Sequence, residues 1–121
     1  MTPLEGLRVL IVEDEAPIAM MIEDMLQEMG CVVAGAAANV EDALRQVENG
    51  AFGFAFLDLN LGGRSAEGVA DALAAKQIPF AIGSGYGRSG LPAHLQGRPV
   101  LQKPFLSAEL ERAMREALGA D

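Results

Sequence analysis

Several features are scarce or missing in this chain of 121 residues, and each absence excludes a class of protein. The single cysteine, Cys31, excludes a disulfide framework and a cysteine-rich zinc site. No apolar run approaches the roughly 20 residues that a membrane span needs. The first residues lack the basic and apolar regions of a signal peptide, so we expect a cytoplasmic protein that does not associate with membranes.

Clusters of basic residues are also missing. Residues 1–60 carry eleven Asp and Glu against two Arg (a net of −9), and residues 61–121 carry six against seven Lys and Arg (+1), which gives the total of −8. Binding of nucleic acids depends on clustered Lys and Arg, so we expect no nucleic-acid partner. The acidic excess has two interpretations at this point: a surface that favours solubility, or carboxylates that bind a divalent cation.

The composition itself indicates one globular domain over residues 1–121. Half of the residues are hydrophobic and 21% are charged, and a chain of this length can bury a core without disulfides or metal. We find no internal repeat, linker or low-complexity segment, and we expect no output domain beside it.

Short apolar runs alternate with amphipathic segments along the chain. The runs predict strands over residues 7–12, 31–36, 52–57, 78–82 and 99–102. Apolar residues at helical spacing predict helices over residues 18–29, 40–47, 65–73 and 108–118. Asn39 and Ser107 are the predicted caps of two helices, and Gly30 is the predicted end of the first. Residues 84–96 contain three glycines and a proline, and they favour at most a short additional helix. This alternation predicts an α/β domain with a mostly parallel sheet.

Polar residues follow four of the predicted strands. Glu13 and Asp14 follow the first, Asp58 the third, Ser84 the fourth and Lys103 the fifth. Ligands of doubly wound sheets bind at these carboxyl ends. Two carboxylates about 4 Å apart repel by roughly 4 kcal/mol at an effective dielectric constant of 20, so the group needs a cation. Oxygen ligands suit magnesium, which keeps a position for a phosphate oxygen.

Each of these residues also has a plainer interpretation when it is taken alone. Glu13 and Asp14 favour the start of a helix through its dipole, and Asp58 and Ser84 are common in turns. Lys103 is one of two lysines in the chain and suits a solvated surface. Their shared position at strand ends favours the functional interpretation, in which Lys103 lies next to a carboxylate or phosphoryl oxygen.

Three motifs of the chain resemble the receiver domain of two-component response regulators: Val12-Glu13-Asp14-Glu15, Phe56-Leu57-Asp58-Leu59-Asn60 and Lys103-Pro104-Phe105. Ser84 lies between the last two, and the resemblance covers essentially the whole chain. It implies a doubly wound, five-stranded parallel sheet of order 2-1-3-4-5 with helices on both faces, as in flavodoxin. It also implies a cis peptide bond between Lys103 and Pro104.

The resemblance implies roles for the residues that match the family's motifs. Asp58 would be the phosphoacceptor, which takes the phosphoryl group from a histidine kinase or a histidine phosphotransfer protein. Asp14, Asp58 and the backbone carbonyl of Asn60 would bind Mg²⁺, or Mn²⁺ in its place, and Glu13 would help through a water. Such a protein is not an enzyme with a separate substrate, because it catalyses only its own phosphorylation and dephosphorylation.

The phosphoryl group has its own set of implied contacts. Lys103 and the hydroxyl of Ser84 would contact it, together with the backbone of Asn60 and Gly85. The protein would then pass the phosphoryl group on, drain it from a kinase, or bind a protein target. We expect a monomer or a weak dimer that depends on phosphorylation.

Residues 79–87 are similar to a narrower subgroup, the stand-alone receivers of alphaproteobacterial stress-response systems. Their motif reads Pro-Phe-x-Phe-Ala-Thr-Gly-Tyr. This chain departs from it at Ile82, Gly83 and Ser84, which stand where the motif has Phe, Ala and Thr.

The switch of this receiver is predicted to differ from the common one. Many receivers have an aromatic residue three positions before the lysine, where this chain has Val100. The only tyrosine is Tyr86 in a glycine-rich stretch, so we predict that phosphorylation reshapes residues 83–92 and relocates Tyr86. The alternative is a loop that is simply mobile, with Tyr86 packed locally.

Three other functions stay open at this point. Residues 85–90 fit the Gly-x-Gly-x-x-Gly fingerprint of dinucleotide binding, although Pro92 opposes the helix that should follow. A phosphatase with an aspartyl nucleophile would share Asp58 and Lys103, but such enzymes have a second aspartate where this chain has Asn60. A degenerate receiver would keep the fold and serve only as a binding module.

Overall fold

The computed structural model describes residues 4–85 and 91–119. In chain order its elements are β1 (Arg8–Val12), α1 (Ala16–Glu28), β2 (Val32–Ala37), α2 (Val40–Asn49), β3 (Phe54–Asp58), β4 (Asn60–Leu61), β5 (Arg64–Ser65), α3 (Glu67–Ala75), β6 (Phe80–Ser84), the 3-10 helix η1 (Ala93–Leu95), β7 (Val100–Gln102) and α4 (Ser107–Ala117). All five predicted strands are present, each within two residues of its predicted bounds.

Five of the strands form one parallel sheet in the order β2-β1-β3-β6-β7. Counted along the chain without the short strands β4 and β5, this order is 2-1-3-4-5, as the resemblance implies. The strand order reverses at β1 and β3, so the carboxyl ends of these two neighbours mark the point where such sheets bind ligands.

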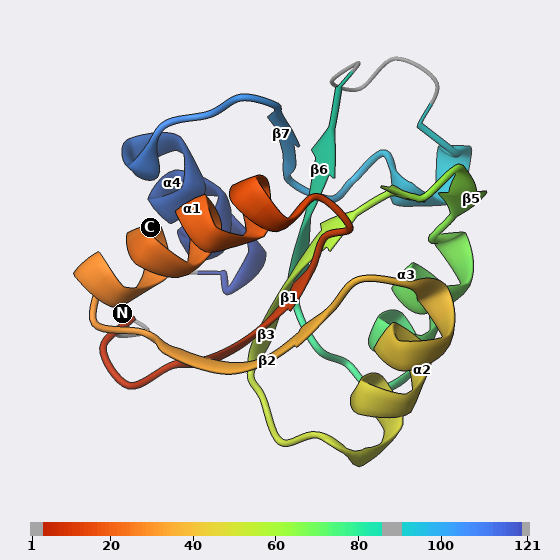
Figure 1. Ribbon diagram of the computed structural model, residues 1–121, viewed down its shortest axis with the longest axis horizontal. Coiled ribbons are helices and arrows are strands. Elements are labelled where there is room, and N and C mark those ends of the chain that lie inside the picture. Colours follow the sequence, from red (N-terminus) through yellow and green to blue (C-terminus); the bar gives the residue numbers. More distant parts are fainter. Residues whose placement is uncertain (1–3, 86–90, 120–121) are drawn as a thin grey trace.

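Helices cover both faces of this sheet, with α1 and α4 on one side and α2 and α3 on the other (Figure 1). Alternate residues of each strand enter different cores because side chains of a strand point to opposite faces. Val9 and Ile11 pack with α1 and α4, whereas Leu10 and Val12 pack with α2 and α3. Most residues of the central strands are therefore apolar, which explains the apolar runs in the sequence.

Two predicted helix ends are confirmed by their hydrogen bonds. At the end of α1, Gly30 adopts a positive φ of 84°, and Cys31 donates its N–H to the carbonyl of Leu26 at 2.9 Å. This is the Schellman arrangement, which favours glycine at that position. At the start of α2, the side chain of Asn39 accepts the N–H of Asp42 at 2.8 Å.

The prediction that a helix begins at Ser65 is wrong, because a small hairpin occupies residues 60–65. Gly62 and Gly63 both have positive φ values, 60° and 86°, which lets a two-residue turn join the antiparallel strands β4 and β5. Ser65 ends β5, and α3 begins at Glu67, whose N–H is donated to the Ser65 hydroxyl at 3.2 Å.

The predicted cap of the last helix is wrong by one residue. Ser107 is the first residue of α4, and Leu106 occupies the cap position in an extended conformation. Leu106 has no side-chain acceptor, so Glu109 reaches back and accepts the N–H of Leu106 at 2.8 Å. The acidic residue of a capping box is thus present without its usual hydroxyl partner.

The weakly helical segment 84–96 contains only one turn of 3-10 helix, η1, within its described residues. The helix after β7 is consequently the fourth α-helix, α4, of the described ranges rather than a fifth. The peptide bond between Lys103 and Pro104 is cis, as the resemblance implies.

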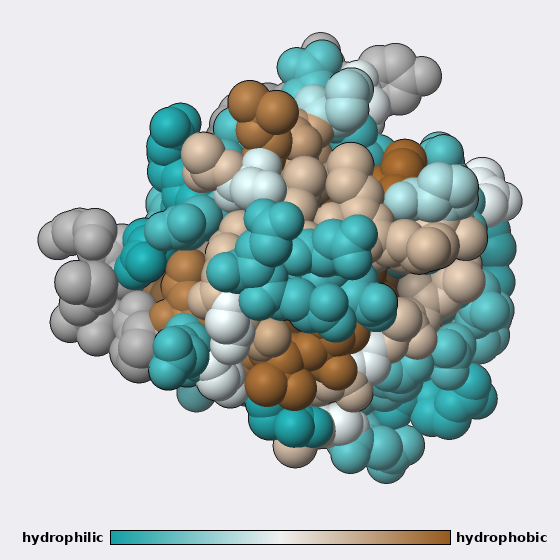
Figure 2. Space-filling model, turned by 60° about the vertical axis from the view of Figure 1, so that its left-hand side comes forward, coloured by the Kyte–Doolittle hydropathy of each residue, from teal (hydrophilic) through white to brown (hydrophobic). Residues whose placement is uncertain are grey.

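The surface on the side of α1 and α4 carries hydrophobic groups separated by hydrophilic ones (Figure 2). Among the described residues, the large hydrophobic side chains with the greatest exposure are Met20 and Leu106, at 66% and 71%. Within residues 4–85 and 91–119, none of the helices has the length and apolar character that a bilayer crossing requires.

Candidate functional site

The site lies at the carboxyl end of the sheet and continues the side-chain alternation of the α1/α4 face. Val9 and Ile11 of β1 belong to that face, and Glu13 comes next in the same alternation. In β3, Phe54 and Phe56 precede Asp58 in the same way. Lys103 likewise follows Leu101 of β7. The strand register therefore brings two carboxylates and one ammonium group to a single place.

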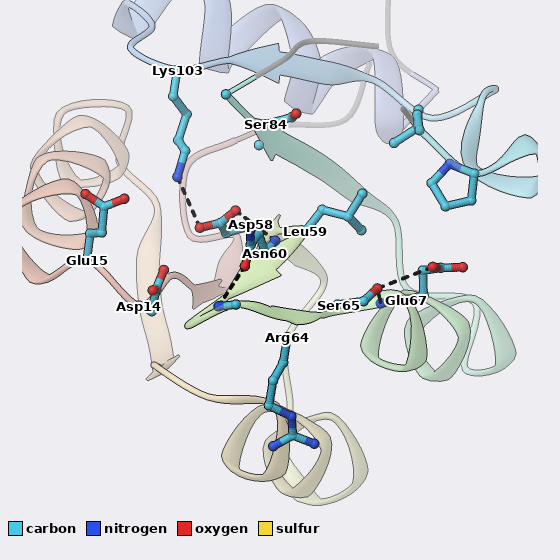
Figure 3. Close-up of a pocket in the computed structure, with 15 residues that line it drawn as sticks. Asp14, Glu15, Asp58, Leu59, Asn60, Arg64, Ser65, Glu67, Ser84 and Lys103 are labelled. Carbon is cyan, nitrogen blue, oxygen red and sulfur yellow. Dashed lines mark hydrogen bonds and ion pairs between the residues drawn. The ribbon is translucent and has the colours of Figure 1, made fainter. Parts of the chain in front are cut away.

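Lys103 connects the two buried carboxylates, and Figure 3 shows its contact with Asp58. Its Nζ lies 3.0 Å from Oε1 of Glu13 and 3.1 Å from Oδ2 of Asp58. The side chain of Glu13 is fully buried and that of Asp58 is 5% exposed. Buried charges require such partners because their solvation by water is lost. The pairing of Lys103 with a carboxylate, one of its two predicted contacts, is therefore present.

Burial and the shared lysine change the ionisation of this group. Burial is the largest cause that raises the pKa of Glu13 to about 7, and a hydrogen bond with Asp58 adds to it, while Lys103 partly opposes it. Burial lowers the pKa of Lys103, but its hydrogen bonds to the two carboxylates raise it more, so the ammonium form is favoured. Near neutral pH, Lys103 is therefore positively charged, and Glu13 is close to the pH at which its carboxyl releases a proton.

Asp14 approaches from the other side of β1 and is exposed. Its Oδ2 accepts the N–H of Gly62, in the β4–β5 hairpin, at 3.0 Å. The slight burial of Asp14 raises its pKa, but this backbone hydrogen bond and its neighbours outweigh it and lower the pKa below the ordinary value. Asp14 is therefore ionised at neutral pH and is held toward the other carboxylates.

Asn60 connects Asp58 to the hairpin. Its backbone N–H is donated to Oδ1 of Asp58 at 3.2 Å, and its side-chain oxygen accepts the N–H of Gly63 at 2.9 Å. Sequence reasoning missed the contribution of this hairpin, although the Gly62-Gly63 pair is a known hairpin signal. The hairpin orients both Asp14 and Asp58 through backbone N–H groups.

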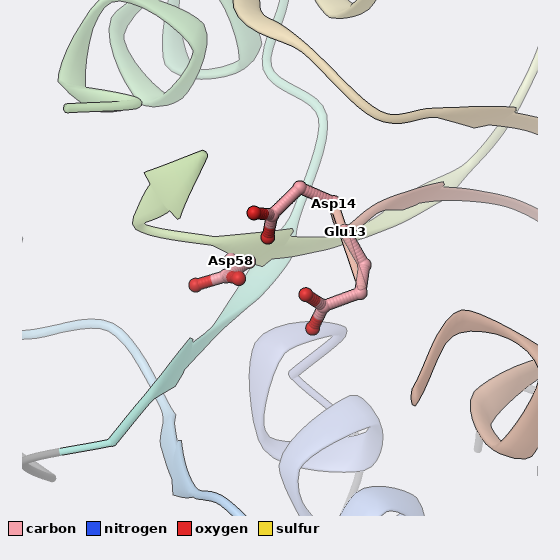
Figure 4. Close-up of side chains that lie close together, drawn as sticks. All are labelled: Glu13, Asp14 and Asp58. Carbon is pink, nitrogen blue, oxygen red and sulfur yellow. The ribbon is translucent and has the colours of Figure 1, made fainter. Parts of the chain in front are cut away.

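Glu13, Asp14 and Asp58 could together hold a metal ion (Figure 4). One carboxylate oxygen from each residue can be chosen so that all three lie within 4.8 Å of one another. A set of carboxylate oxygens without nitrogen or sulfur fits a hard divalent cation such as Mg²⁺. The donor set thus fits the cation that the family resemblance implies.

A pocket of about 810 Å³ opens over Asp14 and Asp58. Ser84 and Gly85, at the end of β6, line it together with Asp58 and Lys103, so the structure brings the predicted phosphoryl contacts together. Leu91 and Pro92 form part of the wall, and so does Arg64 of the hairpin; sequence reasoning assigned none of these three. In Figure 3 the side chain of Arg64 points away from Asp58, and it pairs with Glu41 of α2.

Some predictions concern residues outside the described ranges. Tyr86, the predicted switch, lies there, as do the last residues of the Gly-x-Gly-x-x-Gly match. The dinucleotide interpretation requires that match to open an α-helix, and residues 91–99 contain only the 3-10 turn η1. Val100 lies at the start of β7 and is partly buried.

Comparisons with known proteins agree with this geometry. The sequence model of the response regulator receiver domain matches residues 9–115. The solution structure of SdrG from Sphingomonas melonis Fr1 is 41% identical, has a TM-score of 0.84, and the alignment covers 98% of this chain and 99% of that one. The receiver domain of PhyR from Erythrobacter litoralis is 26% identical, with a TM-score of 0.84 and coverages of 98% and 94%.

A longer relative and the curated proteins complete the comparison. The response regulator PhyR from Brucella abortus is 28% identical, with a TM-score of 0.77, and the alignment covers 94% of this chain and 48% of that one. This chain therefore resembles only about half of that protein. No curated protein sequence gives a significant match.

Proposed function

The chain belongs to the family of response regulator receiver domains, and we propose that it accepts a phosphoryl group on Asp58 from a phosphohistidine of a histidine kinase or phosphotransfer protein. The observation that carries this proposal is the position of Asp58. Its carboxylate lies at the floor of an open pocket, between the ammonium group of Lys103 and the backbone N–H of Asn60. Glu13 and Asp14 lie beside it.

The transfer needs a nucleophile and a means of stabilising the transferred charge. A carboxylate oxygen of Asp58 attacks phosphorus, a P–O bond forms as the N–P bond of the phosphohistidine breaks, and the imidazole leaves with that electron pair. Lys103 neutralises charge on the phosphoryl oxygens, and the hydroxyl of Ser84 and the N–H of Gly85 donate hydrogen bonds to them. Positioning and charge stabilisation therefore supply most of the catalysis.

The acidic residues provide the place for a divalent cation. Asp14, Asp58 and the backbone carbonyl of Asn60 would hold Mg²⁺, with Glu13 near the ion, and Mn²⁺ is the alternative because it shares the preference for oxygen ligands. When bound, the cation supplies positive charge next to the phosphoryl oxygens. Lys103 and the bound cation would then place two separate positive charges next to the phosphoryl group, which suits its charge of about −2.

The phosphorylated state ends by hydrolysis or by onward transfer. Water attacks phosphorus, the P–O bond to Asp58 breaks, and inorganic phosphate leaves while the carboxylate is restored. The chain is thus its own substrate and not an enzyme that turns over another molecule. In its phosphorylated form it acts through proteins, as a carrier or sink for the phosphoryl group or by binding a target protein.

Incorporation of labelled phosphate tests the proposal. A phosphorylated histidine kinase, or a small acyl phosphate, should label the wild-type protein only in the presence of Mg²⁺. Asp58→Asn should remove the label, whereas Asp71→Asn, at an exposed aspartate of α3, should keep it. Equal labelling of wild type and Asp58→Asn would refute the assignment.

A further inference from the structure

Phe56 and Gly83 are packed together directly beneath the site. Phe56 lies on β3, two residues before Asp58, and is fully buried. Gly83 lies on β6, where it is the register partner of Asp58, and its carbonyl accepts the N–H of Leu59 at 3.3 Å. The Phe56 ring fills the space beside Gly83, because a Cβ placed on Gly83 would lie 2.5 Å from Cζ of the ring.

The same ring contacts the segment that carries the lysine. The ring centroids of Phe56 and Phe105 are 5.7 Å apart at an interplanar angle of 39°, and Phe105 is also buried. Phe105 comes two residues after Lys103, whose backbone N–H is donated to the carbonyl of Ser84 at 3.0 Å. The ring, which belongs to the strand that ends in Asp58, therefore contacts the two segments that bear Ser84 and Lys103.

We propose that Phe56 and Gly83 are a pair of positioning residues that set the separations among Asp58, Ser84 and Lys103; this inference rests on the function proposed above. A phenylalanine fits at position 56 because position 83 has no Cβ. With alanine at 83, the ring must shift within a close-packed core, or β6 must move away from β3. Either shift displaces Ser84 or Lys103 relative to Asp58.

The test compares Gly83→Ala, Phe56→Leu and the double variant, with an acyl phosphate as phosphodonor. We expect Gly83→Ala to slow phosphorylation of Asp58 by about tenfold or more, because a displacement of about 1 Å can cost 10²-fold. The smaller leucine leaves room for the new Cβ, so Phe56→Leu/Gly83→Ala should recover most of the wild-type rate. The affinity for Mg²⁺ should change much less, since the carboxylates and the Asn60 carbonyl that would hold it follow β1 and β3 rather than β6 or β7.

Gly35→Ala is the matched control. Gly35 lies in β2 of the same sheet, and a Cβ there would lie 2.3 Å from Oε1 of Gln46. That atom is the end of a flexible side chain, which can move aside, so we expect a wild-type rate of phosphorylation. If Gly83→Ala does not fold, Phe56→Leu and the double variant carry the test, and the double variant should be phosphorylated faster than Phe56→Leu, because the new Cβ refills the space that the shorter side chain leaves.

Three results would count against the proposal, and they are distinguishable. Wild-type protein that accepts no phosphate overturns the proposed function and the positioning role with it. Gly83→Ala that is phosphorylated as fast as wild type overturns the positioning role alone. Gly83→Ala could also be slow while the added Phe56→Leu restores its melting temperature but not its rate of phosphorylation. That result overturns the positioning role, because packing and positioning would then be separate.

Discussion

The two faces of the sheet are built by the same alternation but end differently. On the α2/α3 face, Leu57 of β3 is followed in the alternation by another leucine, Leu59. On the α1/α4 face, the alternation ends in Glu13 and Asp58, the two buried charged residues of the described ranges. The α2/α3 face thus brings only the exposed Asp14 and the half-buried Ser84 to the site, whereas the other face extends its buried core into the chemistry. A carboxylate at the end of a buried strand is held in a fixed position and loses its hydration. The loss of hydration shifts its pKa, and the fixed position keeps its partners in place, as is typical of functional sites.

The largest effect on the rate of phosphorylation should come from removing the positive charge of Lys103, on the α1/α4 face. We expect Lys103→Ala to lower the rate of phosphorylation by about 10²-fold or more, because the charge that stabilises the phosphoryl oxygens is removed. The fold should persist with Mg²⁺, which neutralises Glu13 and Asp58 in its place. Lys76→Ala is the control, since the ammonium group of Lys76 donates a hydrogen bond to the carbonyl of Glu48 and not to the carboxylates of the site. A large fall in melting temperature with Mg²⁺ present would contradict this expectation.

A substitution on the other face should separate stability from chemistry. Leu73 of α3 is fully buried in the α2/α3 core, and Leu73→Ala should lower the free energy of unfolding by about 3 kcal/mol. Urea denaturation measures this loss. Phosphorylation per folded molecule should match wild type. A slowing comparable to that of Lys103→Ala would show that the two faces are not independent.

The dependence of Mg²⁺ affinity on pH sharpens the comparison further. Because burial raises the pKa of Glu13 to about 7, a cation that binds below this pH must displace a proton from that carboxyl. We expect the affinity to fall by up to about tenfold per pH unit as the pH decreases from about 7 to 6, and to level off above about 8. Calorimetric titration with Mg²⁺ measures this. Glu13→Gln should abolish the dependence; an unchanged slope would assign the proton to another group.

The smallest effect is expected outside both cores. Arg64 on the hairpin pairs with Glu41 of α2, and their side chains are 60% and 65% exposed. Water screens such pairs, so Glu41→Gln should leave the melting temperature nearly unchanged. Thermal unfolding measures this. A large fall in melting temperature would mean that the hairpin depends on this contact.

The sequence predicted those parts of the fold that depend on local signals. The apolar runs identified every strand of the main sheet, and Asn39 and Gly30 marked helix ends because each acts on neighbouring backbone groups. The hairpin was missed although Gly62-Gly63 is a local signal, because the adjoining strands have only two residues each. Ser107 was misplaced as a cap because Glu109 satisfies the helix start without a hydroxyl.

The residues of the site were predicted, together with a contact between Lys103 and a carboxylate, but most of its other contacts were not. The positions of Asp58 and Lys103 at strand ends follow from the pattern, whereas the pairing of Lys103 with both Glu13 and Asp58 depends on how three strands lie side by side. The packing of Phe56 against Gly83 likewise joins residues 27 positions apart, and no local pattern reports it. The register between strands and the packing of side chains that are distant in sequence could therefore be seen only in the structure.

Chemical trapping of the phosphorylated residue tests the central claim most directly. Borohydride reduces an acyl phosphate of aspartate to homoserine, which mass spectrometry locates by residue. After incubation with a phosphodonor and Mg²⁺, homoserine should appear at position 58, and it should be absent when Mg²⁺ is chelated. Homoserine at another position, or none in protein that has taken up phosphate, would contradict the role of Asp58.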